Sequence, residues 1–490
     1  MKSALSSTIL GIILLVVFSH FTPVKKTAAD QPKEKQPDLL VIFVDQWRGQ
    51  ALGFMKKEPV QTPCIDKFAQ QSLVVKQMVS NNPLCSPARA MLMTGQYSLH
   101  NHVYANVNSR TAPDNIELPT NAICWSDVLK ANGYFNGYVG KWHLDSPHEP
   151  YIPTSNNTKA LAWNEWTPPQ KRHGFDYWYS YGTYDEHLRP MYWDNDAVRD
   201  SFHYVDEWGP VHEADKALAF FKNEHKERDA GKPFSLVVSI NPPHSNYTQV
   251  PQQYLDRYKN IPVDSLIKDA DIPPAGTEMG DFYRKNVKLY YAAITGVDEQ
   301  IGRILNGLKE MNLDKNTIVV FVADHGNCLG KHEEESKNNI YEESLRIPLI
   351  VSWPGHVAPR LDSTFLGSML DLYPTVLDMM GLGKQIPSSV DGKSYAAYFK
   401  KGAGVKPSEQ FILGTINSHD PNSGFRGIRT AEYKLAYVKN KGKTDAYFFD
   451  LKKDPFELDN IYNSSDSRVK QFDKTLKTYL QKTNDPFKIN

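Results

Sequence analysis

The segment LLVIFVD, residues 39–45, is an unbroken apolar run that stops at a carboxylate. A short apolar run without alternation predicts a strand buried on both faces, as in a parallel sheet. Runs of the same form follow at three later places along the chain. Strands that alternate with helices predict an α/β fold with a large, mostly parallel sheet sandwiched by helices. The helical patterns between the runs lie at residues 125–131, 214–225 and 287–311.

Ionisable side chains follow each of the four apolar runs. In an open α/β sheet, ligands bind outside the carboxyl ends of the strands. We therefore expect these side chains to converge on one rim of the sheet, although they are far apart in the sequence. The set consists of Asp45 after the first run, Lys141 and His143 after residues 134–139, His244 after residues 234–240, and Asp324 and His325 after residues 317–323.

The chain changes character at about residue 405. Beyond it, short strand-like pieces separated by turns precede an amphipathic helical pattern at residues 469–481. These features predict a small C-terminal α+β subdomain with an antiparallel sheet. The expected organisation is a signal peptide at 1–29, a linker at 30–37, a catalytic domain at 38–404 and this subdomain at 405–490.

The N-terminus has the pattern of a secretory signal. Lys2 precedes an apolar run at residues 9–18, and the small residues Ala28 and Ala29 follow a polar stretch. A charged region, an apolar region and a small-residue cleavage zone predict export, to the periplasm or the extracellular space. The apolar run is too short to span a bilayer comfortably, so we expect no stable membrane insertion.

Charge and cysteine usage exclude two classes of protein. The 56 lysines and arginines balance 56 aspartates and glutamates. Because nothing in this balance indicates a polyanion-binding surface, we expect no nucleic-acid partner. The four cysteines permit disulfides but are too few for a disulfide scaffold. Three of them, Cys64, Cys124 and Cys328, stand outside any motif that we recognise.

The fourth cysteine begins the segment CSPAR, residues 85–89, and Thr94-Gly95 follows it. This stretch resembles the Cys-x-Pro-x-Arg signature of the formylglycine-dependent sulfatases, which have the alkaline-phosphatase-like fold. The resemblance implies that a formylglycine-generating enzyme oxidises Cys85 to formylglycine (3-oxoalanine). The hydrated aldehyde would then attack the sulfur of a sulfate ester and later release the sulfate, splitting one hard step into two. Arg89, one helical turn beyond Cys85, would point its guanidinium at the diol.

Two residue pairs resemble the family's metal ligands. They are Asp45-Gln46 after the first strand and Asp324-His325 after the late strand, with the modified Cys85 completing the set. An oxygen-rich site suits Ca²⁺, with Mg²⁺ or Mn²⁺ as alternatives. Gln46 stands where a second aspartate is frequent in the family, and His325 stands where asparagine is frequent. These departures leave the identity of the metal open.

Further matches supply the remaining catalytic residues. GKWHL, residues 140–144, matches a family block in which Lys141 would hold a sulfate oxygen and His143 would assist sulfate elimination. His244, in Asn-Pro-Pro-His, would be the general acid that protonates the leaving alcohol. Lys337 matches the family's second lysine, beside the leaving oxygen. With later blocks, the match extends over residues 38–465.

Two alternatives remain open. Phosphonate or phosphate monoester hydrolases of the same superfamily often share the Asp-Gln and Asp-His pairs, but they tend to replace the lysine and histidine of the GKWHL block. Both residues are intact here, which favours sulfate esters. A non-catalytic binder of sulfated glycans would need a lost nucleophile or ligand, and the sequence shows none.

The segment at residues 145–211 is expected to form much of the substrate pocket. It is rich in aromatic and ionisable residues, which stack on sugar rings and bind hydroxyls, although loop packing would use the same residues. We therefore expect a sulfated saccharide substrate, glycosaminoglycan or algal, and a role in polysaccharide degradation. The candidate substrate-binding residues are His173, Tyr184, Asp185, His187 and Arg189.

Overall fold

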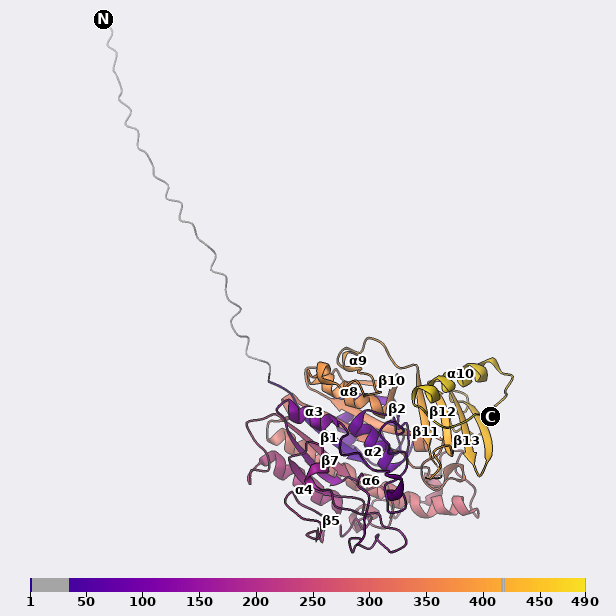
Figure 1. Ribbon diagram of the computed structural model, residues 1–490, viewed down its shortest axis with the longest axis horizontal. Coiled ribbons are helices and arrows are strands. Elements are labelled where there is room, and N and C mark those ends of the chain that lie inside the picture. The colour runs from indigo at the N-terminus through magenta and orange to yellow at the C-terminus, as the bar shows by residue number, and fades with distance from the viewer. Residues whose placement is uncertain (2–34, 416, 418, 490) are drawn as a thin grey trace. The chain divides into compact units, whose positions relative to one another are not determined.

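A large sheet forms the centre of the computed structural model (Figure 1), which describes residue 1, residues 35–415, residue 417 and residues 419–489. Its strand order is β10-β2-β9-β8-β1-β7-β3-β4. All neighbouring pairs are parallel except those that β9 makes with β2 and β8. The strands are β1 (Asp38–Val44), β2 (Leu73–Val79), β3 (Phe135–Lys141), β4 (Tyr177–Tyr181), β7 (Phe234–Ile240), β8 (Thr317–Ala323), β9 (Arg346–Ser352) and β10 (Arg360–Ser368).

The central strand β1 is buried along its whole length, between β7 and β8. Val44 is in register with Ile240 on one side and with Ala323 on the other. The backbone pairing continues one residue further, because Asp324 N donates to Val44 O at 3.1 Å. The strands therefore end together, and the polar residues that follow them share one rim, as the sequence predicts.

Helices flank the sheet in two groups. On one side α4 and α1 pack against the long helix α6, and in the other group α2 packs against α3 and α8. Helix α6 begins at the cap Thr277, whose side chain accepts a hydrogen bond from Gly280 N. Its apolar residues recur at helical spacing and are buried. The α-helices are α1 (Pro63–Ala69), α2 (Cys85–Thr94), α3 (Trp125–Ala131), α4 (Gly209–Lys222), α5 (Gln252–Leu255), α6 (Glu278–Glu310), α7 (Glu342–Leu345), α8 (Met369–Met379), α9 (Ala396–Lys401) and α10 (Ser467–Lys482).

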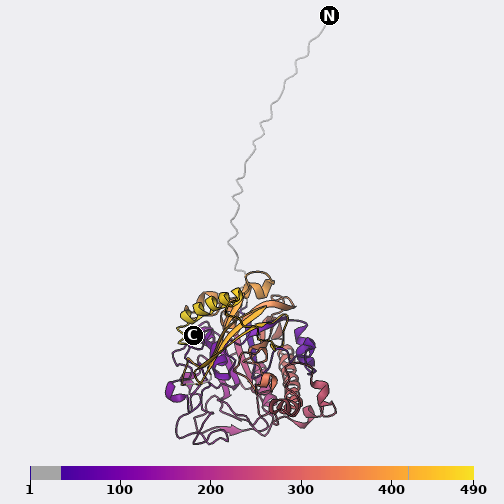
Figure 2. The same ribbon diagram turned by 90° about the vertical axis from the view of Figure 1, so that its right-hand side faces the viewer.

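A second, antiparallel sheet follows in the order β11-β12-β13-β14, as expected for the C-terminal part. Figure 2 shows these strands with α10 beside them, in orange and yellow. The Tyr97 ring lies edge-on to Phe411 at 5.5 Å and to Tyr479 at 6.4 Å, so aromatic packing ties this part to the segment after α2. The strands are β11 (Glu409–Gly414), β12 (Gly424–Thr430), β13 (Tyr433–Asn440) and β14 (Lys443–Asp450), and a two-stranded ribbon is formed by β5 (Met191–Tyr192) and β6 (His203–Tyr204).

The α/β class and the mostly parallel sheet expected from the sequence are confirmed. The predicted helix at 125–131 and the strands at 234–240 and 317–323 have the observed bounds. The predicted signal peptide lies outside the described residues, apart from Met1. None of the helices in the described part of the chain combines the length and apolar character that a membrane-spanning segment requires. All four cysteines are free.

Candidate active site

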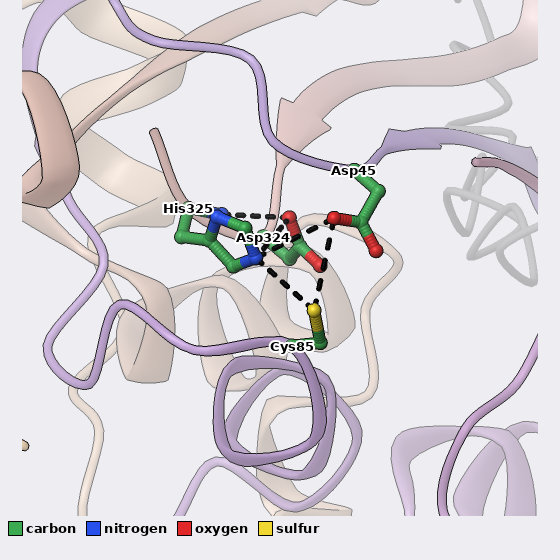
Figure 3. Close-up of side chains that lie close together, drawn as sticks. All are labelled: Asp45, Cys85, Asp324 and His325. Atoms are coloured by element: carbon green, nitrogen blue, oxygen red, sulfur yellow. Dashed lines mark hydrogen bonds and ion pairs between the residues drawn. The ribbon is translucent and has the colours of Figure 1, made fainter. Parts of the chain in front are cut away.

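Cys85 is the first residue of α2 and is 1% exposed. Its Sγ lies 3.3 Å from Nε2 of His325 and 3.8 Å from Oδ1 of Asp45 (Figure 3). Nζ of Lys337 lies 3.2 Å from the same sulfur. Burial and the Asp45 carboxylate raise the pKa of the thiol, but Lys337, Lys141 and His325 bring it well below its ordinary value. A helix N-terminus also favours negative charge. The position therefore suits an anionic, oxygen-bearing group.

Asp45, Cys85, Asp324 and His325 converge with their ligand atoms within 4.8 Å of one another. Nε2 of His325 is 3.4 Å from Oδ1 of Asp45 and 3.5 Å from Oδ1 of Asp324. Nδ1 of His325 lies 2.9 Å from the carbonyl oxygen of Gly326, to which it must donate. Nε2 is therefore the ring nitrogen that faces the two carboxylates, and in the neutral tautomer it can offer its lone pair to a metal.

The electrostatics of the two carboxylates also fit a cation. Burial alone would raise the pKa of Asp45, but Lys141, His244 and Arg89 hold it well below its usual range. Burial and the neighbouring Asp45 raise the pKa of Asp324 to about 6. Oδ2 of Asp324 is buried and accepts no hydrogen bond, although Nη2 of Arg89 lies 3.4 Å from it, and a buried acceptor without a hydrogen bond carries a desolvation cost. A divalent ion would satisfy that oxygen and both charges.

Gln46 is buried beside these ligands, with its backbone N donating to Oδ1 of Asp324 at 3.0 Å. Its side-chain Oε1 accepts from Nζ of Lys337 at 2.8 Å. Its Nε2 donates to the hydroxyl of Tyr247 at 2.9 Å and to that of Ser336 at 3.3 Å. Gln46 thus links the ligand group to Lys337.

Lys141 ends β3 and is fully buried. Its Nζ lies 2.7 Å from Oδ2 of Asp45 and 3.0 Å from Oδ1 of Asn241. Arg89 donates to the same Asp45 oxygen at 3.0 Å and to Lys141 O at 2.8 Å. It also donates to Ser239 at 2.9 Å. Arg89 therefore connects Asp45 to the end of β3 by hydrogen bonds.

The two expected histidines occupy different environments. Nε2 of His143 lies 3.0 Å from Val107 O, and its buried Nδ1 has no hydrogen-bond partner. Burial lowers the pKa of His143, so its imidazole is neutral at pH 7. Nδ1 of His244 lies 2.6 Å from Ser245 O and 3.3 Å from Oδ1 of Asp185. Although burial, Lys337 and Lys141 lower the pKa of His244, the carboxylates of Asp185 and Asp45 raise it to about 9.

The five candidate substrate-binding residues divide into two groups. Asp185 contacts His244, and His187 lies 3.2 Å from His244 O through its Nε2. Tyr184 joins this group through its backbone, because Tyr184 O accepts from Asn241 at 2.9 Å. The contacts found for the other two lead away from Cys85. Nδ1 of His173 lies 3.6 Å from Oδ2 of Asp127 on α3, and the exposed Arg189 pairs with Asp206 at 2.8 Å.

Sequence reasoning missed Asn241, the residue that connects Lys141 to this second cluster. Its Nδ2 donates to Tyr184 O and to Oδ1 of Asp185, while its Oδ1 accepts from Lys141. A signal was present, because Asn241 directly follows β7 and opens the Asn-Pro-Pro-His segment. Ser239 and Ser336 were missed as well, and neither stands in a recognisable motif.

Comparison with known proteins agrees with this geometry. Residues 37–382 match the family described as Sulfatase, and residues 330–485 match N-sulphoglucosamine sulphohydrolase, C-terminal. An endo-4-O-sulfatase of Bacteroides thetaiotaomicron is 38% identical, over 94% of this chain and 95% of its own. An ulvan-active sulfatase of Formosa agariphila is 28% identical, over 99% and 90%. The solved structure of yidJ from Bacteroides fragilis is 48% identical with a TM-score of 0.89, over 93% of this chain and 98% of that one.

The phosphonate monoester hydrolases, the alternative class, are represented by a more distant neighbour. A phosphonate monoester hydrolase of Agrobacterium radiobacter has a TM-score of 0.69 and 21% identity, over 92% of this chain and 95% of its own. That likeness concerns the fold alone. The Sulfatase family covers most of the chain, and the endo-4-O-sulfatase aligns along nearly all of it. This protein therefore belongs to the sulfatase family, the hydrolases of sulfate esters.

Proposed function

We propose that this protein hydrolyses sulfate esters on a sulfated carbohydrate, through a formylglycine made from Cys85 and with a bound divalent metal. The observation that carries the proposal is the position of Cys85 at the start of α2, where its sulfur meets His325 and Lys337 within 3.3 Å. Formylglycine would supply a geminal diol, of which one hydroxyl attacks sulfur and the other permits release of the sulfate. The buried, unpartnered Nδ1 of His143 fits a second polar group at this position.

Asp45, Asp324 and His325 would hold the metal, together with an oxygen of the modified Cys85 and the side-chain oxygen of Gln46. Two carboxylates balance the charge of a dication, and Oδ2 of Asp324, which accepts no hydrogen bond, is available as a ligand atom. A mainly oxygen donor set favours Ca²⁺, with Mg²⁺ or Mn²⁺ as the alternatives. When bound, the ion would polarise a sulfate oxygen and lower the pKa of the attacking hydroxyl.

The cationic side chains would bind the sulfate group. Lys141 and Lys337 approach the ligand group from different strands and loops, so each can reach a different sulfate oxygen. Fixed charges in a buried site stabilise developing negative charge without having to reorganise. Arg89 would hold Asp45 and Lys141 in place, because its Nη2 donates to Oδ2 of Asp45 and its Nη1 donates to Lys141 O.

The two histidines would move protons at different stages. His244 would donate the proton that the leaving alcohol needs, and the pKa of about 9 keeps its imidazole charged at neutral pH. Neutral His143 would accept the proton that is lost when the diol collapses and sulfate leaves. An acid and a base with separated pKa values can act in sequence at one pH.

We propose a carbohydrate substrate because relatives of this chain are named endo-4-O-sulfatase and ulvan-active sulfatase. Aromatic side chains near the site support this view, since the Trp163 ring lies 6.1 Å from that of His143. Aromatic faces stack on the apolar faces of sugar rings. Tyr184, Asp185, His187, His173 and Arg189 remain candidates for contacts with the sugar.

We further propose export to the periplasm or the extracellular space, with residues 38–404 as the catalytic domain and residues 405–490 as a C-terminal subdomain. Polymeric sulfated glycans lie outside the cell, which agrees with an exported enzyme. Fractionation of cells that express the full chain tests the export. Recovery of the mature protein in the cytoplasm alone would contradict it.

The test of function is sulfate release from a panel of sulfated saccharides, aryl sulfates and phosphonate monoesters. Wild type and Cys85→Ala are compared, both co-expressed with a formylglycine-generating enzyme. We expect release from one sugar class by the wild type only. Peptide mass spectrometry should show the aldehyde at residue 85. An unmodified thiol in fully active protein would refute the nucleophile, and preferential phosphonate cleavage would refute the substrate class.

A further inference from the structure

We propose that Asp185 is the positioning residue of His244: it orients the imidazole and holds the proton that the leaving alcohol receives. The inference deepens the proposed function and rests on it. It replaces the sugar contact expected for Asp185 with a role in proton transfer. Asp185 lies shortly after β4, while His244 lies shortly after β7, so only the fold brings them together.

The geometry at His244 determines which ring nitrogen can act. Nδ1 faces two acceptors, Ser245 O at 2.6 Å and Oδ1 of Asp185 at 3.3 Å. A nitrogen between two acceptors must carry a proton and donate it. The opposite nitrogen, Nε2, is then the one that delivers a proton to the alcohol oxygen. A carboxylate that fixes a histidine tautomer in this way is a recurrent catalytic device.

Asp185 is itself held in place. Nδ2 of Asn241 donates to Oδ1 of Asp185 at 3.2 Å, and Oδ1 of Asn241 accepts from Nζ of Lys141 at 3.0 Å. His187 supports the same loop by donating from Nε2 to His244 O at 3.2 Å. Burial lowers the pKa of His187 to about 4, so it serves as a neutral donor. The chain Lys141–Asn241–Asp185–His244 joins the proposed sulfate-binding lysine to the proton donor.

Charge supports the same assignment. The groups that act on His244 are Lys337 and Lys141, which disfavour the imidazolium, and Asp185 and Asp45, which favour it. Of these four groups, it is the Asp185 carboxylate that contacts the ring, at 3.3 Å from Nδ1. Its side chain is 42% exposed, so solvent screens part of its charge. Replacement by asparagine would keep the shape and remove the charge.

A series of aryl sulfates with leaving groups of increasing pKa tests this role, beside a sulfated saccharide. Wild type, Asp185→Asn and His244→Gln are compared. Asp215→Asn is the matched control, because Asp215 is a similarly exposed carboxylate that pairs with Arg303, and neither residue belongs to the site. General acid catalysis contributes about 10²- to 10⁴-fold. We expect Asp185→Asn to lose about 100-fold on the poorest leaving groups and less than about 10-fold on the best.

The pH profile and a double variant complete the test. Without Asp185 the His244 imidazolium loses its proton more easily, so the alkaline limb of kcat should move to lower pH, and Asp185→Glu should restore part of it. The double variant Asp185→Asn/His244→Gln should lose little more activity than His244→Gln alone. The inference would be overturned if kcat of Asp185→Asn depended on the pKa of the leaving group as in the wild type and only the KM for the saccharide rose. Asp185 would then be a sugar-binding residue. Absence of sulfate release from the wild type would overturn the proposed function itself.

Discussion

Lys141→Met is expected to lower both the catalytic rate and the stability of the protein. Methionine keeps an unbranched side chain of similar length and removes the ammonium group. The lost contacts are those of Nζ with Oδ2 of Asp45 at 2.7 Å and with Asn241 at 3.0 Å. Both ends of the ion pair are fully buried, so water cannot replace the missing donor.

The magnitude follows from what remains. Removing one fixed donor to developing charge costs about 10²- to 10³-fold in kcat. Removing one partner of a buried ion pair costs about 3–5 kcal/mol of stability. In Lys141→Met, Asp45 would still pair with Arg89 at 3.0 Å. We therefore expect the loss of stability to lie near the lower end of that range, at about 3 kcal/mol. A bound metal would also neutralise Asp45, so the loss of stability should be smaller with metal than without.

Steady-state sulfate release and thermal unfolding, each with and without Ca²⁺, measure both effects. Lys130→Met is the control, because Lys130 pairs with Asp176 but its side chain is 50% exposed. We expect it to retain activity and to lose less than about 1 kcal/mol. A loss of activity below about 10-fold in Lys141→Met would refute the role of Lys141 at the sulfate. If Lys141→Met lowered Tm equally with and without Ca²⁺, the argument that the metal and Lys141 both neutralise the Asp45 carboxylate would be refuted.

Three further predictions concern metal and pH. Chelation with EDTA should abolish sulfate release and lower Tm, and Ca²⁺ should restore both; full activity after complete metal removal would contradict the metal site. Burial lowers the pKa of His332, but its hydrogen bonds to Asp271 and Glu343 raise it to about 9 from an ordinary 6.5. Stability from this contact, about 3 kcal/mol, is therefore present below pH 6.5 and lost as pH rises through about 9, and His332→Gln should flatten that fall in Tm. Burial raises the pKa of Glu213 to about 8 from 4.5, so the native state loses stability as pH rises between these values. Glu213→Gln should therefore unfold at a higher temperature than wild type at pH 9, and a lower Tm there would show that the Tyr181 and Tyr192 hydroxyls need the carboxylate.

Sequence patterns were sufficient for the framework of the site. Apolar runs locate β1, β7 and β8, and parallel strands must present their carboxyl ends on one edge. The sequence alone therefore places Asp45 and Asp324 together. The Cys85 motif is local, so its helix and its neighbour Arg89 could also be anticipated. The structure confirms this convergence in the distances around the Cys85 sulfur.

The partners of individual side chains could not be predicted. Gln46 has the expected position, yet its side chain is hydrogen-bonded to Tyr247 and to the adjacent residues Ser336 and Lys337, which come from two distant segments. Arg89 donates to Oδ2 of Asp45 and to Lys141 O, contacts that its place in the motif does not reveal. These outcomes depend on rotamers, which the packing of neighbouring elements selects.

The sequence alone determined the fold class, the sulfatase family and the residues that meet at the rim, because periodicity and local motifs encode them directly. The tertiary structure alone decided that Asp185 contacts His244, that Asn241 connects Asp185 to Lys141, and that His173 pairs with Asp127. Asp185 follows β4, Asn241 and His244 follow β7, and Asp127 lies on α3. Their contacts follow from how these separate elements pack together, and no local pattern in the chain records that packing.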